Sequence, residues 1–131
     1  MQTHTTHLRV RYDECDPMGL VHHSNYLRYF EIGRTEMLRA AGGRYRDMED
    51  AGQLVVVAKI QCNYKSPARY DDVIEVQTTI AKVTAAKIIH HYTITRQDQT
   101  LVTAVVTLAV IDRHGKLQRV PESLIQQYES F

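Results

Sequence analysis

The sequence contains little cysteine, no tryptophan and no long apolar run. Its two cysteines, Cys15 and Cys62, form no Cys-x-x-Cys pair, and the first ten residues lack the apolar stretch of a signal peptide. We therefore expect a reducing, cytoplasmic setting. The longest apolar runs, 54–58 and 108–111, fall far short of the roughly 20 residues that cross a bilayer, which predicts no membrane span.

An excess of one charge sign is also missing. Sixteen Lys and Arg residues stand against fifteen Asp and Glu residues, so the formal net charge is +1. A nearly neutral chain has no surface-wide positive field to hold nucleic acid or an anionic membrane. We expect no nucleic-acid partner, and an anionic ligand must meet a local basic patch.

The residues that are present suffice for one folded domain. The chain has 131 residues, of which 44% are hydrophobic and 24% charged. A chain of this length buries roughly two-thirds of the surface that its unfolded form exposes. The composition therefore excludes disorder as the main state and predicts a single domain over residues 1–131.

The first part of the chain predicts a strand followed by a shaped loop. Apolar and charged residues alternate from His7 to Asp13, which is typical of a half-buried strand. Pro17 fixes its own φ and Gly19 permits a turn that other residues resist. We expect the first few residues of the chain to be loosely held.

A helix is predicted from Asn25 to Ala41, with Ser24 as its N-cap and the glycines at 42–43 as its end. Its apolar face has the spacing of three and four residues that a helix requires. The residues of this face are Tyr26, Phe30, Gly33, Met37 and Ala40. Gly33 costs roughly 1 kcal/mol relative to alanine. We interpret it as tight packing of the helix on a sheet, with the close approach of a ligand as the alternative.

Four long segments rich in β-formers follow: 54–64, 73–84, 86–96 and 100–112. Short polar breaks separate them, and such links favour antiparallel neighbours, so we expect a four-stranded meander. The last segment is apolar on both faces, which indicates an interior strand covered by the helix on one side and by a partner or ligand on the other. After Glu122 we expect a loosely held tail with a short helix over 124–128.

Catalytic potential is concentrated in residues 12–26, which contain three carboxylates, a thiol, two imidazoles and two tyrosines. A helix N-terminus offers free N–H groups and partial positive charge to a developing oxyanion. A carboxylate facing those groups across a carbonyl would form an acyl-transfer site. A Cys15 nucleophile beside His23 is the alternative, although a small buried cysteine is commoner.

No residue spacing matches a zinc pattern, and His90 and His91 are expected to point to opposite faces of a strand. We therefore expect no metal and no cofactor.

The run from Tyr12 to Tyr26, with 29–31 and 34–36 after it, resembles the signature of the hotdog-fold acyl-CoA thioesterases, specifically the 4-hydroxybenzoyl-CoA thioesterase family and its bacterial relatives. The turn 66–72 and the segments 103–112 and 119–121 resemble later parts of the same family. The resemblance implies an α+β hotdog fold, in which a curved antiparallel sheet of about five strands wraps one long central helix. It also implies a homodimer or homotetramer with active sites at subunit interfaces.

The same resemblance implies roles for individual residues. Asp16 would act as nucleophile or general base on the thioester, and the backbone N–H of His23 would polarise the carbonyl. Tyr12 and the His23 side chain match positions implicated in some members. Substrate contacts would fall on Gly19, Val21 and Ser24, with candidates for the nucleotide phosphates at Lys82, Lys87, Arg113, Lys116 and Arg119.

Two departures from the family pattern limit the substrate assignment. His23 replaces the aromatic residue of the 4-hydroxybenzoyl-specific branch, and 84–86 lacks the basic cluster of some relatives. The expected function is hydrolysis of an acyl-CoA thioester, or an acyl-carrier-protein thioester, to a free acid and a thiol. The alternatives are a hotdog dehydratase, whose acid would be Glu31 or Glu36 on the helix, and a non-catalytic acyl-thioester-binding module in which Asp16 only caps its loop.

Overall fold

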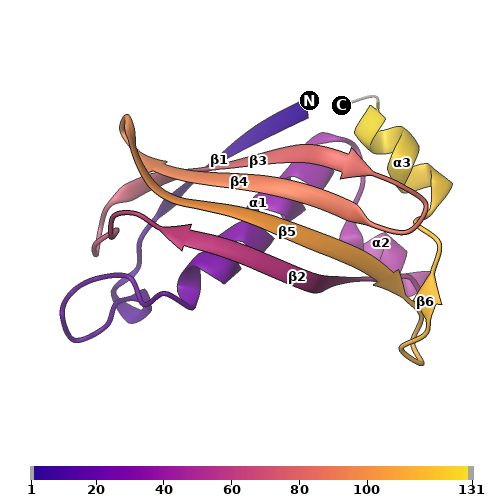
Figure 1. The fold of residues 1–131 in the computed structure, drawn as a ribbon, viewed down its shortest axis with the longest axis horizontal. Helices are drawn as coiled ribbons and strands as arrows, with labels where there is room; N and C mark the ends of the chain where they lie inside the picture. The colour runs from indigo at the N-terminus through magenta and orange to yellow at the C-terminus, as the bar shows by residue number, and fades with distance from the viewer. Residues whose placement is uncertain (1, 130–131) are drawn as a thin grey trace.

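The computed structural model describes residues 2–129 and arranges them as a long helix lying against a curved antiparallel sheet (Figure 1). The strands are β1 (Gln2–Arg9), β2 (Leu54–Tyr64), β3 (Val73–Val83), β4 (Ile88–Arg96), β5 (Gln99–Ile111) and β6 (Leu117–Gln118). The helices are α1 (Asn25–Ala40), α2 (Tyr45–Asp50) and α3 (Glu122–Glu129), with a 3-10 turn η1 (Tyr12–Glu14). The expected fold class, a long helix wrapped by a curved antiparallel sheet, is confirmed.

The order of strands differs from the expected meander. The sheet runs β1-β3-β4-β5-β2, so β2 pairs with β5 and not with β3, its successor in the chain. The link after Tyr64 therefore carries the chain across the sheet, and the prediction that it joins antiparallel neighbours was wrong. β5 lies between β4 and β2, which confirms it as an interior strand.

Helix α1 packs on the inner face of the sheet through its apolar side. Tyr26, Phe30 and Met37 are buried as expected, but Ala40 is exposed. A Cβ on Gly33 would lie 2.7 Å from Thr78 Oγ1 and 2.9 Å from Val76 Cγ1, both on β3. The glycine is thus explained by tight packing of the helix on the sheet.

Both ends of the described chain are held by the fold. β1 begins at Gln2 and pairs with β3 from Gln2↔Ile80 to Arg9↔Val73, so the strand lies earlier than the predicted 7–13. The polar residues of this edge strand concealed it. Helix α3 buries Leu124 and Tyr128, which explains why the tail is ordered. The expectation of loosely held ends was wrong for residues 2–6 and 123–129.

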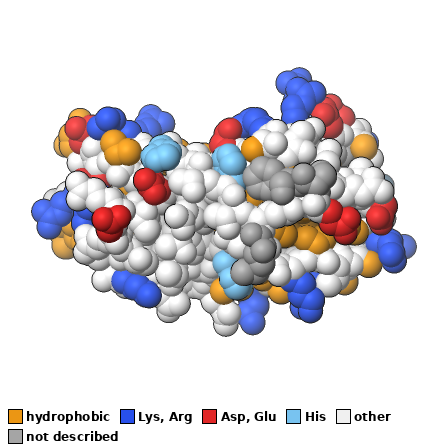
Figure 2. All heavy atoms as spheres, turned by 90° about the horizontal axis from the view of Figure 1, so that it is seen from above, with side chains coloured by type: hydrophobic (Ala, Val, Ile, Leu, Met, Phe, Trp, Pro, Cys, Tyr) orange, Lys and Arg blue, Asp and Glu red, His pale blue; other side chains and the backbone are white. Residues whose placement is uncertain are grey.

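None of the helices within residues 2–129 combines the length and the apolarity needed to cross a membrane. Lys and Arg side chains alternate with Asp and Glu around the face in Figure 2 and form no large area of one sign there. This distribution agrees with the near-zero net charge.

Candidate active site

The segment between β1 and α1 forms a folded loop at one end of the sheet, where β3 begins. Isolated bridges join Cys15 to Val21 and Leu20 to Arg69, and Val10 N–H donates to Asp72 O at 2.8 Å. The loop is therefore fixed both to itself and to the turn that precedes β3. These contacts hold its polar side chains in place.

Glu14 joins the loop to the helix and serves structure. Its Oε1 accepts hydrogen bonds from Arg11 N–H at 2.7 Å and from the Tyr29 hydroxyl at 3.0 Å. Its carbonyl accepts from His22 N–H at 3.0 Å and from Asn25 Nδ2 at 2.7 Å. Burial together with the nearby Glu14 carboxylate raises the pKa of Tyr29 far above its ordinary value, so the phenol remains a donor.

Asp16 uses only one of its two carboxylate oxygens to shape the loop. Oδ1 accepts from Met18 N–H at 2.9 Å and from Leu20 N–H at 3.2 Å. Gly19 N–H donates to Asp16 O at 2.9 Å and has a φ of 78°, the left-handed conformation that glycine adopts without strain. Oδ2 receives no hydrogen bond from the described residues, so half of the carboxylate is available to a ligand.

Helix α1 starts at the predicted residue, with Ser24 as its N-cap. Ser24 occupies the N-cap position, but its hydroxyl makes no cap hydrogen bond and lies 2.8 Å from His22 Nδ1. Ser24 N–H donates to the same nitrogen at 3.3 Å, so the imidazole of His22 fixes the residue that precedes the helix. Just before the helix, the N–H of His23 has no acceptor within residues 2–129.

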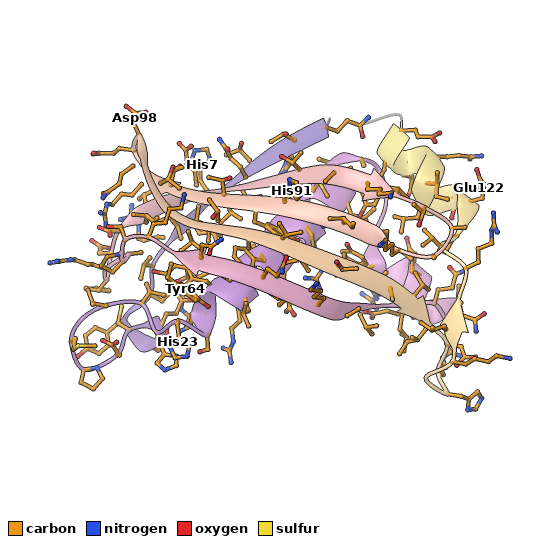
Figure 3. The ribbon with its side chains drawn as sticks, in the orientation of Figure 1. His7, His23, Tyr64, His91, Asp98 and Glu122 are labelled. Atoms are coloured by element: carbon orange, nitrogen blue, oxygen red, sulfur yellow. The ribbon has the colours of Figure 1, made fainter. Side chains whose placement is uncertain are left out.

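Asp16 and His23 line one hollow of about 370 Å³, which we call the Tyr64 hollow. Tyr64, at the end of β2, lies beside His23, as Figure 3 shows: the ring centroids are 6.3 Å apart with an interplanar angle of 79°. The remaining lining residues are Leu20, Val21, Tyr26, Lys65, Ser66 and Pro67. Two residues with an unbonded polar group, Asp16 with its Oδ2 and His23 with its N–H, thus line the same hollow.

Asp16 also lines a second hollow, of about 340 Å³, which we call the Tyr70 hollow. Tyr12 and Tyr70 meet there edge to face, with ring centroids 5.5 Å apart. Tyr12 is 80% exposed and makes no hydrogen bond to Asp16. The other residues that line the Tyr70 hollow are Cys15, Pro17 and Gly19.

The predicted phosphate-binding cations lie at the opposite end of the sheet. Lys82 and Lys87 flank the β3–β4 turn, and Val120 N–H donates to Ala85 O at 2.8 Å, which brings Arg119 to the same end. Lys116 lies in the turn between β5 and β6. Since β3 extends over 11 residues, at roughly 3.3 Å per residue, the cations and Asp16 are separated by about 30 Å within one chain. Arg113 instead donates to backbone carbonyls of Glu49 and Asp50.

The geometry also bears on the alternatives. The Cys15 thiol donates to Arg11 O at 3.7 Å, and burial followed by the charge of Asp16 raises its pKa, which disfavours the thiolate that a nucleophile needs. His90 is buried and His91 exposed, which confirms that they point to opposite faces. Among residues 2–129 no three His, Cys, Asp or Glu side chains are grouped to hold a metal ion.

Sequence reasoning found the loop but missed the walls of the Tyr64 hollow. Tyr26 and Tyr64 are far apart in the sequence, and both read as ordinary apolar positions of a helix and a strand. The one available signal was the turn at 66–72, whose Ala68 N–H donates to the Tyr26 hydroxyl at 3.1 Å. Of the predicted substrate contacts, Val21 lines the Tyr64 hollow and Gly19 the Tyr70 hollow, while Ser24 lines neither.

Residues 10–128 match the model of the thioesterase-like superfamily. The chain is 33% identical to the acyl-CoA thioesterase YbgC of Haemophilus influenzae, over 86% of this chain and 83% of that protein. It superimposes on the DHNA-CoA thioesterase of Staphylococcus aureus with a TM-score of 0.93 and 27% identity, over 99% of this chain and 91% of that one. A 4-hydroxybenzoyl-CoA thioesterase in complex with 4-hydroxybenzoyl-CoA shares the fold at a TM-score of 0.88 and 19% identity, over 97% and 99% of the two chains.

The chain therefore belongs to the thioesterase-like superfamily. The resemblance to the hotdog-fold thioesterases is confirmed, and with it the class of enzyme, a thioester hydrolase.

Proposed function

We propose that this protein is an acyl-CoA thioesterase in which Asp16 acts on the thioester carbonyl and the His23 N–H stabilises the oxyanion. One observation carries the assignment: the unbonded Oδ2 of Asp16 and the unbonded N–H of His23 belong to residues that line the same hollow. A thioester carbonyl placed between them would have an attacking group on one side and a donor on the other.

Two routes are compatible with this arrangement. Oδ2 of Asp16 attacks the carbonyl carbon, the thiolate leaves and takes up a proton, and water then hydrolyses the mixed anhydride. Alternatively, Asp16 removes a proton from a water molecule that attacks directly. A positioned base is worth roughly 10² to 10⁴ in rate, and one oxyanion donor roughly 10² to 10³.

The minimal unit that we propose is a homodimer formed through β2. Two such dimers pair further into a homotetramer. This strand lies at the edge of the sheet, so one of its backbone edges has no strand partner within residues 2–129. Val57 and Ala58 on β2 are exposed, Val57 at 39%. A long edge strand with exposed apolar side chains is a template for pairing with a second copy.

Pairing β2 with its copy about a two-fold axis would also explain the distant cations. In an antiparallel pair, the Tyr64 end of one β2 lies beside the Leu54 end of the other. Leu54 pairs with Ile111 at the end of β5, next to the turn that contains Lys116. The cationic end of the second copy would therefore approach the Asp16 loop of the first, where the phosphates of coenzyme A could meet it.

Sedimentation velocity at micromolar concentration tests the assembly, and we expect no stable monomer. Val57→Lys should weaken the dimer, because it places a charge in the proposed interface. Leu117→Lys, at a side chain that is 72% exposed on β6, is the control and should not. A wild-type chain that sediments as a monomer would contradict the proposal.

The single domain over residues 1–131 would thus act as a cytoplasmic enzyme, a setting that its two free cysteines suit. The dehydratase alternative is weakened because Glu31 and Glu36 line a different hollow on α1, where Glu36 pairs with Arg39. The binding-module alternative has one specific observation in its favour, since Asp16 Oδ1 does cap the loop.

A thiol-release assay over a panel of acyl-CoA and acyl-carrier-protein thioesters tests the proposed function. We expect free thiol and free acid from at least one acyl-CoA. Consumption of a 3-hydroxyacyl thioester without thiol release would favour the dehydratase. Binding of acyl-CoA without turnover would favour the binding module.

The role of the cations is tested by salt and by truncating the substrate. The KM for acyl-CoA should rise with ionic strength, because salt screens the attraction between the phosphates and the lysines. It should also rise in Lys87→Glu and Lys116→Glu, which replace a cation by an anion. The matched control is the acyl-pantetheine, which lacks the nucleotide phosphates and should show neither effect. A KM for acyl-CoA that is independent of salt would contradict this part of the proposal.

A further inference from the structure

Tyr64 has an unusual position for a strand residue. It ends the edge strand β2 and is 51% exposed as a residue, and its ring contacts those of His23 and Tyr26, the latter at a centroid distance of 5.6 Å. Its hydroxyl lies 3.5 Å from His23 O. Burial, followed by the neighbouring Cys62 thiol, raises the pKa of Tyr64 to about 12, so the ring remains a neutral phenol. Figure 3 shows Tyr64 and His23 together at the loop end.

Tyr70 is its counterpart in the second hollow that Asp16 lines. It is 54% exposed, nearly the value for Tyr64, and lines the Tyr70 hollow with Tyr12. Asp16 lines both hollows. A thioester has two arms that diverge from its reacting carbon, an acyl arm and a thiol arm, so two hollows that meet at one carboxylate match its shape.

The two hollows differ in their floors. The Tyr64 hollow contains the side chains of Val21 and Tyr26, which are only 5% and 3% exposed. The residues that line the Tyr70 hollow are all exposed or half-buried. A hydrocarbon group gains more from contact with a buried apolar floor, because less of its surface then remains in water. His23, whose N–H would meet the carbonyl oxygen, also lines the Tyr64 hollow.

We propose that the acyl arm occupies the Tyr64 hollow and that the ring of Tyr64 limits the size of acyl group that this enzyme accepts. The proposal rests on the proposed thioesterase function. Tyr64 is the wall residue most able to set this limit, because it comes from the strand edge and can be truncated without opening the core. The polar rim of Lys65 and Ser66 lies next to it in the chain.

The test compares how four proteins rank acyl groups: the wild type, Tyr64→Ala, Tyr64→Phe and Tyr70→Ala. The measured quantity is kcat/KM for coenzyme A thioesters of increasing chain length, together with benzoyl-CoA. Tyr64→Ala should shift the ratio of large to small acyl groups at least about tenfold toward the large ones, since each methylene group in a pocket changes discrimination by about 10- to 200-fold. Tyr64→Phe keeps the ring and should keep the wild-type ranking.

Tyr70→Ala removes an equally exposed ring beside the same carboxylate and should leave the ranking unchanged. A shifted ranking in Tyr70→Ala but not in Tyr64→Ala would place the acyl arm in the other hollow and overturn the proposal. Unchanged ranking in both variants would overturn it as well. Circular dichroism checks folding, and Tyr64→Leu replaces Tyr64→Ala if the alanine variant does not fold.

Failure of the proposed function has a separate signature, which is a wild-type protein that releases no thiol from any thioester. In that case the same four proteins are compared by calorimetric affinity for non-hydrolysable thioether analogues of acyl-CoA. A size preference that changes in Tyr64→Ala alone would still support the assignment of the hollow. Affinities that do not depend on Tyr64 would overturn it.

Discussion

Two groups of polar residues in this protein contain unbonded hydrogen-bonding atoms, and they differ in whether these residues line a hollow or are closed off from solvent. At the loop end, Asp16 Oδ2 and the His23 N–H are unbonded, and both residues line a hollow that is open to a ligand. Beneath α1, a buried polar cluster of Tyr45, Thr78, His90, Tyr92 and Tyr128 is closed off from solvent, and in it the Thr78 hydroxyl and Nε2 of His90 have no hydrogen-bond partner within residues 2–129. The side chain of Arg34, only 11% exposed, borders them.

The pKa values in the buried polar cluster are the more strongly displaced. Burial lowers the pKa of His90 to about 3, with the charge of Arg34 as a smaller cause, and raises the pKa values of Tyr92 and Tyr128 far above 10. Displaced pKa values often mark catalytic sites. Here they mark packing, whereas the candidate site is marked by unused hydrogen-bonding capacity beside a hollow.

Asp16→Asn should have the largest effect on activity, with little effect on stability. Asn Oδ1 can still accept the N–H groups of Met18 and Leu20, so the loop and the free energy of unfolding should be retained within about 0.5 kcal/mol. The negative charge that Oδ2 needs to attack the thioester or to deprotonate water is lost. The kcat should therefore fall at least about a hundredfold, with a smaller change in KM. Steady-state kinetics and urea unfolding measure the two effects.

Asp13→Asn is the matched control, because Asp13 is exposed and pairs only with Arg11 at the surface. Its kcat should stay near the wild-type value. Glu14→Gln keeps an acceptor oxygen for Arg11 and Tyr29 and should also retain most activity. A normal kcat in Asp16→Asn combined with a loss of stability would mean that Asp16 only caps its loop.

His90 should produce the largest pH effect on stability. Its pKa is near 3 in the folded chain and about 6.5 when unfolded, so between these values the unfolded state binds a proton that the folded state does not. Stability is therefore lost as the pH falls through this window, by about 1.4 kcal/mol per unit. From pH 7 to 4.5 the His90 contribution should be a loss of about 2 to 3 kcal/mol.

Urea unfolding at these two pH values, compared with His90→Gln, isolates the contribution. His91→Gln is the control, since His91 is the exposed neighbour on the same strand. Equal acid sensitivity in the wild type and His90→Gln would show that His90 is not protonated on unfolding. In that case carboxylates elsewhere would have to account for the acid sensitivity.

Local periodicity predicted elements better than their arrangement. The segment 54–64 matches β2 at both ends, and 73–84 matches β3 within one residue, because alternation and β-branched residues are local signals. The pairing of β2 with β5 depends on contacts between distant segments, which no local spacing encodes. β1 was misplaced because its Thr and His residues lack the apolar alternation of a half-buried strand.

The candidate site shows the same limit. The loop residues Asp16 and His23 are close in sequence, and their residue types pointed to acyl transfer. Tyr64 reaches the same hollow from β2 only because the sheet brings the end of that strand to the loop. Ser24 is the N-cap residue, as predicted from its type, but its hydroxyl makes no cap hydrogen bond and lies beside the imidazole of His22.

Alanine substitutions at Gly33, in the interior, and at Gly19, in the loop, should have the smallest effects. They compare directly how each region affects stability and kcat. Gly33→Ala places a Cβ within 3 Å of Thr78 and Val76 on the buried strand β3, so the free energy of unfolding should fall by about 1 to 3 kcal/mol, while kcat per folded molecule stays near wild type. Gly19→Ala meets no atom within 4 Å but must hold a φ of 78°, which costs about 1 to 2 kcal/mol. That strain acts on the turn that orients Asp16. For a given loss in the free energy of unfolding, Gly19→Ala should therefore lower kcat more than Gly33→Ala does. Urea unfolding and thiol release on both variants measure this, and equal ratios of kinetic to stability loss would show that the loop end and the interior are not separate in function.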